Sequence, residues 1–198
     1  MSQSFKKNNY KKKVSSRKGF SLVETLVAIF ILALAISSAM AAVQGSLMSS
    51  FFARDRTTAF FLAQEAVEII KSKRSENGIA NYSGGDVRWL DEIADWDTYG
   101  GPCGSSSDCG VDSLNYQIID CGPSNDDCLL RKNTDGIFNH QSGDPTKFTR
   151  KIRMEEGEED PNEAKIIVTV EWKQGIANKT FEVEEYILNW HPLSGLEE

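Results

Sequence analysis

The 198-residue sequence has few of the residue types on which most catalytic sites depend. It holds two histidines, His140 and His191, far apart in segments rich in turn-forming residues. It contains no H-E-x-x-H, G-x-S-x-G or nucleotide-binding glycine pattern, and no histidine lies among the four cysteines. Metal-dependent hydrolysis, nucleophile–base catalysis and nucleotide chemistry therefore have no motif to support them. We expect no enzyme activity, no cofactor and no bound metal.

Acidic residues are absent from the first 19 positions, which carry seven basic residues. This leaves 15 of the 22 basic residues against all 29 acidic residues, a balance of −14 over the rest of the chain. A basic tail before an apolar run orients a membrane segment with its basic end in the cytoplasm. The alternative is an arm that binds nucleic acid, but the acidic body would repel DNA.

Charge is absent from residues 26–43, and proline is absent from residues 20–74. Together with residues 20–23, the uncharged run is long enough for a membrane-spanning helix over about residues 22–43. Apolar residues then recur at spacings of three, four and seven as far as Ile70, as in an amphipathic helix. Asn77-Gly78 follows as a stop signal. The pattern predicts one helix over residues 20–76, apolar all round in its first half and amphipathic in its second.

The pattern changes after this helix. Residues 77–147 are rich in Gly, Ser, Asp and Asn and contain all four cysteines, so we expect a loop-rich connection. Alternating β-forming residues predict strands at 114–120, 148–154, 165–172 and 179–190. The last three form an antiparallel meander in the C-terminal segment, 148–198. The predicted fold class is α+β, with one long N-terminal helix on a small antiparallel sheet of three to four strands.

The boundary between the basic tail and the apolar run allows two interpretations. Ala39-Met40-Ala41 has the small-residue spacing of a conventional secretory cleavage site, which would make the chain an ordinary secreted or membrane-anchored domain. However, "KGFSLVE" at residues 18–24 resembles the class III signal of type IV prepilins and of type II secretion pseudopilins. The resemblance implies that a prepilin peptidase cuts between Gly19 and Phe20 and that Phe20 is N-methylated. The leader, residues 1–19, is discarded and the apolar helix stays. A long helix followed by a small antiparallel sheet is also this family's architecture.

Glu24 is the only acidic residue from Phe20 to Arg54. A free amine on Phe20 would sit at a helix N-terminus, where the helix dipole and the bilayer both disfavour positive charge. The resemblance implies that Glu24 pairs with the amine of a neighbouring subunit and sets the assembly register. The alternative is local: Ser21-x-x-Glu24 has the spacing of a capping box. Both roles are compatible, since capping belongs to the lone subunit and pairing to the filament.

A second resemblance concerns "LAQEAVEIIKSKR" at residues 62–74 and the strand ends Glu171-Trp172 and Leu188-Asn189-Trp190. These resemble minor pilins of the PilV type and pseudopilin I of type II secretion. Any amphipathic helix under a sheet needs similar apolar spacing, so the pattern is less specific. The alternative within the family is a pilus-tip adhesin or DNA-uptake pilin, for which Trp89, Trp96 and Tyr99 would be exposed contacts.

The resemblance also implies partners and location. The partners are the prepilin peptidase, other major and minor pilins, the inner-membrane assembly platform and lipid of the cytoplasmic membrane. Nucleic acid is expected only for a DNA-uptake pilus. The chain would cross the cytoplasmic membrane once with its N-terminus inside, and would then enter a cell-surface pilus or a pseudopilus.

The cysteines follow the spacing C-x5-C-x11-C-x6-C, which differs from the close pairs of zinc sites. Export would place them in an oxidising space, which favours disulfides. Of the three possible connectivities we favour the two local loops, Cys103–Cys109 and Cys121–Cys128, although pilins often tie a C-terminal loop onto the sheet instead. The same region is rich in carboxylates and carboxamides, but it lacks the calcium-loop frame, so we expect a solvated acidic loop. These residues are Asp108, Asp112, Asp120, Asn125, Asp126, Asp127 and Asp135.

Overall fold

The structure is a computed structural model that describes residues 19–96, 99–122, 128–157 and 160–189. The predicted leader lies outside the described residues except for Gly19, and so do residues 125–127 of the acidic loop, Trp190 and His191. The chain divides into two compact units, Met1–Ser49 and Ser50–Glu198. One helix, α1 (Leu22–Tyr82), contributes to both.

In the first unit, α1 buries none of its side chains. Its apolar residues, such as Leu26 and Phe30, are more than half exposed. The Ser37 hydroxyl donates to the Ala33 carbonyl at 2.8 Å, and the neighbouring Ser38 hydroxyl also donates to a carbonyl of the helix. Both hydroxyl donors are therefore satisfied within the helix, as an apolar environment would require. Among the described residues, α1 is the helix that is long and apolar enough to cross a membrane.

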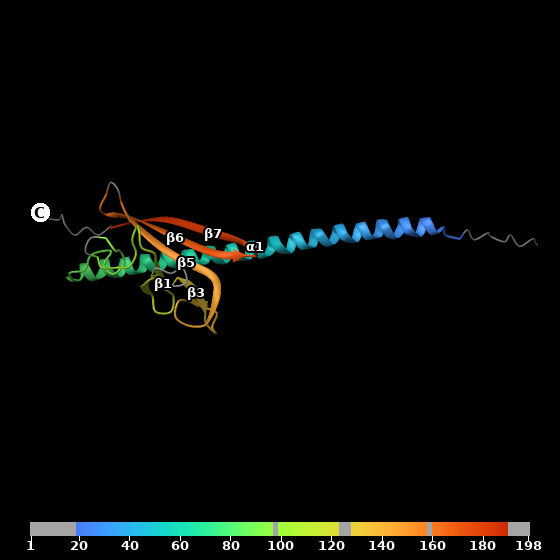
Figure 1. Cartoon of the computed structure of the whole chain (residues 1–198). Coiled ribbons are helices and arrows are strands. Elements are labelled where there is room, and N and C mark those ends of the chain that lie inside the picture. Colours follow the sequence, from blue (N-terminus) through green and yellow to red (C-terminus); the bar gives the residue numbers. More distant parts are fainter. Residues whose placement is uncertain (1–18, 97–98, 123–127, 158–159, 190–198) are drawn as a thin grey trace, which may run out of the picture. The chain divides into compact units, whose positions relative to one another are not determined.

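In the second unit, one face of α1 is buried. The buried side chains from Ala59 to Ile70 recur every three or four residues, as expected for a stripe that packs on a sheet. Figure 1 shows strands β5, β6 and β7 running alongside this part of α1. The predicted amphipathic half is therefore confirmed.

The helix continues past the predicted stop at Asn77-Gly78 and ends at Tyr82. Asn77 is buried, and its side-chain amide donates to the Asp91 carbonyl at 2.9 Å, so it serves a tertiary contact rather than a helix end. The actual stop is Gly84, which has a φ of 88°. The Gly84 N–H donates to Asn81 and the Gly85 N–H donates to Ala80, the pair of bonds of a Schellman cap. Gly84-Gly85, and not Asn77-Gly78, therefore ends the helix.

The C-terminal meander is confirmed. Strand β5 (Asp144–Glu156) pairs with β6 (Glu163–Gln174), and β6 pairs with β7 (Ala177–Leu188), all antiparallel. Alternate residues of β6, from Ala164 to Trp172, are buried against the core, while those between them face outwards. Strands β5 and β6 extend two to four residues beyond the predicted bounds at their N-terminal ends, because the ladder continues through polar residues.

The sheet is larger than predicted. Within the described residues it has seven strands instead of three to four. The four additional or displaced strands are short: β1 (Cys109–Asp112), β2 (Gln117–Asp120), β3 (Leu129–Lys132) and β4 (Phe138–Asn139). Strands β1 and β3 pair with the edge of β5 that β6 leaves open. Because each is two to four residues long and rich in polar residues, no alternating pattern identifies them, and residues 77–147 are more than a loop.

The predicted strand at 114–120 is half turn. Strand β2 begins at Gln117, and residues 114–116 form the reversal from β1. Asp112 starts this turn, since its carboxylate accepts from the Leu114 N–H at 2.9 Å. Tyr116 completes it with a φ of 56°. Local side-chain bonding therefore overrides the β propensity of "LNY".

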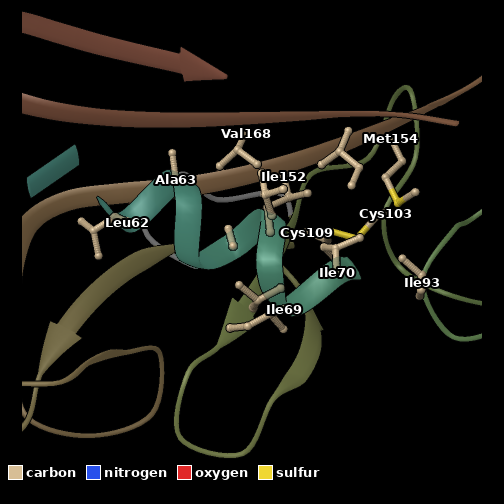
Figure 2. Close-up of a cluster of buried hydrophobic side chains, with 14 of the residues drawn as sticks. Leu62, Ala63, Ile69, Ile70, Ile93, Cys103, Cys109, Ile152, Met154 and Val168 are labelled. Carbon is tan, nitrogen blue, oxygen red and sulfur yellow. A yellow bond between two sulfur atoms is a disulfide. The ribbon is translucent and has the colours of Figure 1, made fainter. Parts of the chain in front are cut away.

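The core joins α1, the sheet and the cysteine-containing segment. Figure 2 shows Ile70 of α1, Ile152 and Met154 of β5 and Val168 of β6 gathered around one cluster, with Cys103 bonded to Cys109 at its edge. The region between α1 and β5 is thus tied into the core at several points.

Candidate functional site: the start of the long helix

The segment before α1 presents an open peptide bond. Gly19, Phe20 and Ser21 are outside regular secondary structure, and α1 begins at Leu22. Nothing lies within 4 Å of the position where a Cβ on Gly19 would be. Phe20 is 76 % exposed. Within the described part of the chain, nothing would obstruct a peptidase at the Gly19–Phe20 bond.

Ser21 is the N-cap of α1. Its carbonyl accepts the first helical bond, from the Thr25 N–H at 3.1 Å. The Thr25 hydroxyl donates back to the Leu22 carbonyl at 2.8 Å and is thereby satisfied within the helix. The sequence "FSLVET" thus starts the helix directly after the predicted cleavage point, so a mature chain would begin one residue before the cap.

Glu24 lies exposed in the first helical turn, where the helix dipole favours a carboxylate. In the part of the chain that the structure describes, no side-chain hydrogen bond joins it to Ser21. The reciprocal bonds of the capping box are therefore absent from the lone subunit, although the spacing permits them. The Glu24 carboxylate remains available to a group from outside the chain.

The four cysteines form the two local disulfides that their spacing favoured. Cys103 is bonded to Cys109 and Cys121 to Cys128, with Cα–Cα distances of 4.9 Å and 5.1 Å. All four are buried, and no described cysteine is free. Structural disulfides form and persist mainly in oxidising compartments.

The carboxylates near the cysteines have structural partners. Asp108 pairs with Arg153 at 2.8 Å, and the Asp120 carboxylate accepts from the Gly122 N–H at 2.8 Å. Among the described residues no group of three or more His, Cys, Asp or Glu side chains is arranged to hold a metal ion. Asn125, Asp126 and Asp127 of the predicted acidic loop lie outside the described residues.

Sequence analysis missed a buried polar cluster centred on Arg150. This guanidinium is fully buried, donating to Glu65 at 2.7 Å and to the carbonyls of Leu62 and Val111 at 3.0 Å and 2.7 Å. Burial lowers the pKa of Arg150, and the Glu65 carboxylate opposes that shift. One signal in the sequence could have revealed it. In the predicted strand 148–154, Arg150 alternates in step with the apolar residues that face inwards, such as Phe148 and Ile152. The cluster ties β5 to α1 and to β1, and its role is structural.

The aromatic residues proposed as adhesive contacts are mostly covered. Trp89 is only 7 % exposed and belongs to the core. Trp96 and Tyr99 are half-buried and stack edge to face with ring centroids 6.4 Å apart. The Arg88 guanidinium lies 4.3 Å from the centre of the Tyr99 ring. The expectation that these side chains are exposed was wrong, since they pack the connection onto the helix end.

Comparison with known families identifies the N-terminal segment. Residues 14–40 match the family model described as a prokaryotic N-terminal methylation motif. The chain carries a methylation signal. That motif is typical of type IV pilins and pseudopilins, and the long helix packed on an antiparallel sheet is consistent with their fold. The match covers the start of the apolar half of α1 and the residues directly before it. No curated protein and no solved structure matches the chain.

Proposed function

We propose that this chain is a minor pilin or pseudopilin, a structural and non-catalytic subunit of a type IV pilus or a type II secretion pseudopilus. The observation that carries the proposal is the methylation motif over residues 14–40, with Gly19 and Phe20 directly before the first turn of an apolar helix. A prepilin peptidase cleaves after Gly19 on the cytoplasmic side, and Phe20 becomes the methylated N-terminus.

Glu24 then guides assembly. In an apolar bundle of helices, the new amine on Phe20 has no other acidic partner, because the next acidic residue in the chain is Asp55. The amine of one subunit pairs with the Glu24 carboxylate of its neighbour. Such a pair adds little net stability in an apolar environment, but a mismatched register would leave both charges unpaired, so the pair selects one register.

Processing is tested by the mass of the mature chain. Wild type is expected to begin at a methylated Phe20, and a Gly19→Leu variant is expected to keep the leader because the bulky side chain blocks the peptidase. Gly45→Ala is the matched control, since Gly45 also has nothing around it and lies outside the motif. A mature chain that begins at Ala42 would instead show cleavage of a conventional signal.

Assembly is tested with Glu24→Gln, which keeps the shape of the side chain and removes its charge. The variant should insert into the membrane and be processed normally, but its incorporation into filaments should fall by at least about tenfold, because the amine loses its partner. Glu68→Gln, at an exposed position further along α1, serves as the control and should assemble normally. Filament levels equal to wild type for Glu24→Gln would contradict the assigned role.

A further inference from the structure

The last two turns of α1, green in Figure 1, carry apolar side chains that the described chain leaves uncovered. Ile79 is 68 % exposed and Tyr82 is 72 % exposed. Counted from Ser75, the residues Gly78, Ile79 and Tyr82 follow at spacings of three, four and seven, so they share one face of the helix. All of them belong to the unit Ser50–Glu198.

This face is one wall of a groove of about 410 Å³, which we call the helix-end groove. Trp89, a core residue, also lines it. Nothing lies within 4 Å of the position where a Cβ on Gly78 would be, so the wall has a notch beside the exposed apolar side chains. A groove of this size, with an apolar lining, can take up an aromatic ring. The full lining is Arg74, Ser75, Gly78, Ile79, Tyr82, Trp89 and Asn189.

The end of β7 is fixed at this groove. The Arg74 guanidinium donates to the Leu188 carbonyl at 3.3 Å. The Asn189 N–H donates to the Asn162 carbonyl at 2.7 Å, and the Asn189 side-chain amide donates to the Asn162 side chain at 3.2 Å. Asn189 is itself part of the lining. The next residue, Trp190, therefore starts at the groove, with its Cα about 3.8 Å from that of Asn189.

The residues that follow suit the groove in chemistry and in length. Residues 190–198 read WHPLSGLEE and lie outside the described residues. Trp190 and Leu193 are apolar, and Pro192 restricts His191 to extended backbone. The groove follows about eight residues of α1, or about 12 Å of helix. The four residues from Trp190 to Leu193 cover about the same length when extended.

We propose that the segment Trp190–Leu193 of this chain binds the helix-end groove, with the Trp190 ring over Gly78 and against Ile79 and Tyr82. The short tether gives Trp190 an effective concentration in the millimolar range, so even a weak apolar contact keeps it bound and a free partner would have to displace it. Docking ties the end of β7, which pairs only with β6 among the described strands, to the end of α1. The inference does not rest on the proposed pilin function.

The test is fluorine NMR of the full chain in detergent micelles, with 5-fluorotryptophan at the four tryptophans. Trp190→Phe identifies the Trp190 resonance, and Trp172, which is buried in β6, reports whether each variant is folded. A soluble gadolinium chelate relaxes exposed fluorine nuclei. Gly78→Leu fills the groove, so the Trp190 fluorine should relax at least about threefold faster than in wild type. Ala80→Leu adds the same side chain on the other side of α1 and should leave the relaxation of Trp190 unchanged.

A second pair of variants tests the apolar wall. Tyr82→Ser should also speed the relaxation of Trp190, whereas Tyr186→Ser removes an exposed tyrosine of β7 outside the groove and should not. Equal relaxation of Trp190 in wild type and in Gly78→Leu would overturn the proposal. Protection of Trp190 that disappears on dilution of the protein would also overturn it, because a second copy would then supply the tryptophan.

Discussion

At the scale of single residues, His140 shows how burial sets a charge state. Both ring nitrogens are buried and have no hydrogen-bond partner among the described residues, and the ring lies near Arg150 and Asp112. Desolvation, and then the positive charge of Arg150, lower the pKa of His140 from 6.5 to about 4, against a smaller opposing effect of Asp112. The imidazole is therefore neutral in the folded protein at neutral pH.

This depressed pKa predicts a pH-dependent stability. Between pH 6.5 and about 4 the unfolded chain takes up a proton on His140 that the folded chain does not. The contribution of the neutral His140 to the free energy of unfolding is therefore fully present above pH 6.5. It is lost as the pH drops towards 4, by about 2–3 kcal/mol after allowance for partial exposure. Urea unfolding at several pH values should show a shallower loss in His140→Gln than in wild type. Parallel profiles for the two proteins would contradict the assignment.

At the scale of elements, the two disulfides have different surroundings. Cys103 and Cys109 belong to the core cluster, and the Cys103 N–H donates to the Ile93 carbonyl at 3.0 Å, so this bridge holds the connection after α1 onto the sheet. The bridge between Cys121 and Cys128 is buried outside that cluster. The Cys103–Cys109 bridge therefore anchors a core segment, and the Cys121–Cys128 bridge does not.

Replacing both members of a bridge with alanine should separate these roles. Each closed loop is short, so the chain-entropy effect is about 2–3 kcal/mol for either bridge. Loss of Cys103–Cys109 should cost about 1 kcal/mol more, because core contacts are lost as well. Limited proteolysis should then cleave within residues 83–108, whereas loss of Cys121–Cys128 should leave that segment resistant. Equal unfolding midpoints and equal cleavage would contradict this ranking.

The elements also show which predictions can be made locally. Long segments with strong periodicity, such as α1 and the meander, were predicted from residue patterns because many positions repeat the same signal. The helix end was misplaced since Asn77 resembles a stop until its bond to Asp91 is known. Strands β1, β3 and β4 were missed because their pairing is tertiary: β1 and β3 pair with the open edge of β5, and β4 pairs with β3.

At the scale of the whole molecule, the core lies in one of the two units. Among the residues that the structure describes, every buried core residue falls between Ala59 and Ile187, and none lies in the unit Met1–Ser49. Residues 50–198 should therefore fold alone into a soluble domain, because removal of the apolar helix half takes away no core contact. Circular dichroism should show one cooperative thermal transition, and a non-reducing peptide map should recover both disulfides. Aggregation, or a transition without cooperativity, would contradict this independence.

The sequence by itself supported the predictions that depend on neighbouring residues in the chain. The basic leader, the Gly19–Phe20 bond, Glu24 and the apolar run all lie within residues 1–43, and their order carries the prediction. Tertiary structure decided what depends on distant residues. It buried Arg150 between α1 and β1. It enclosed the His140 ring where no described residue offers it a hydrogen bond. It also aligned β7 with α1, so that the turn at Ile176 lies towards Ser50. No local pattern records these contacts, because each arises only when segments far apart in sequence pack together.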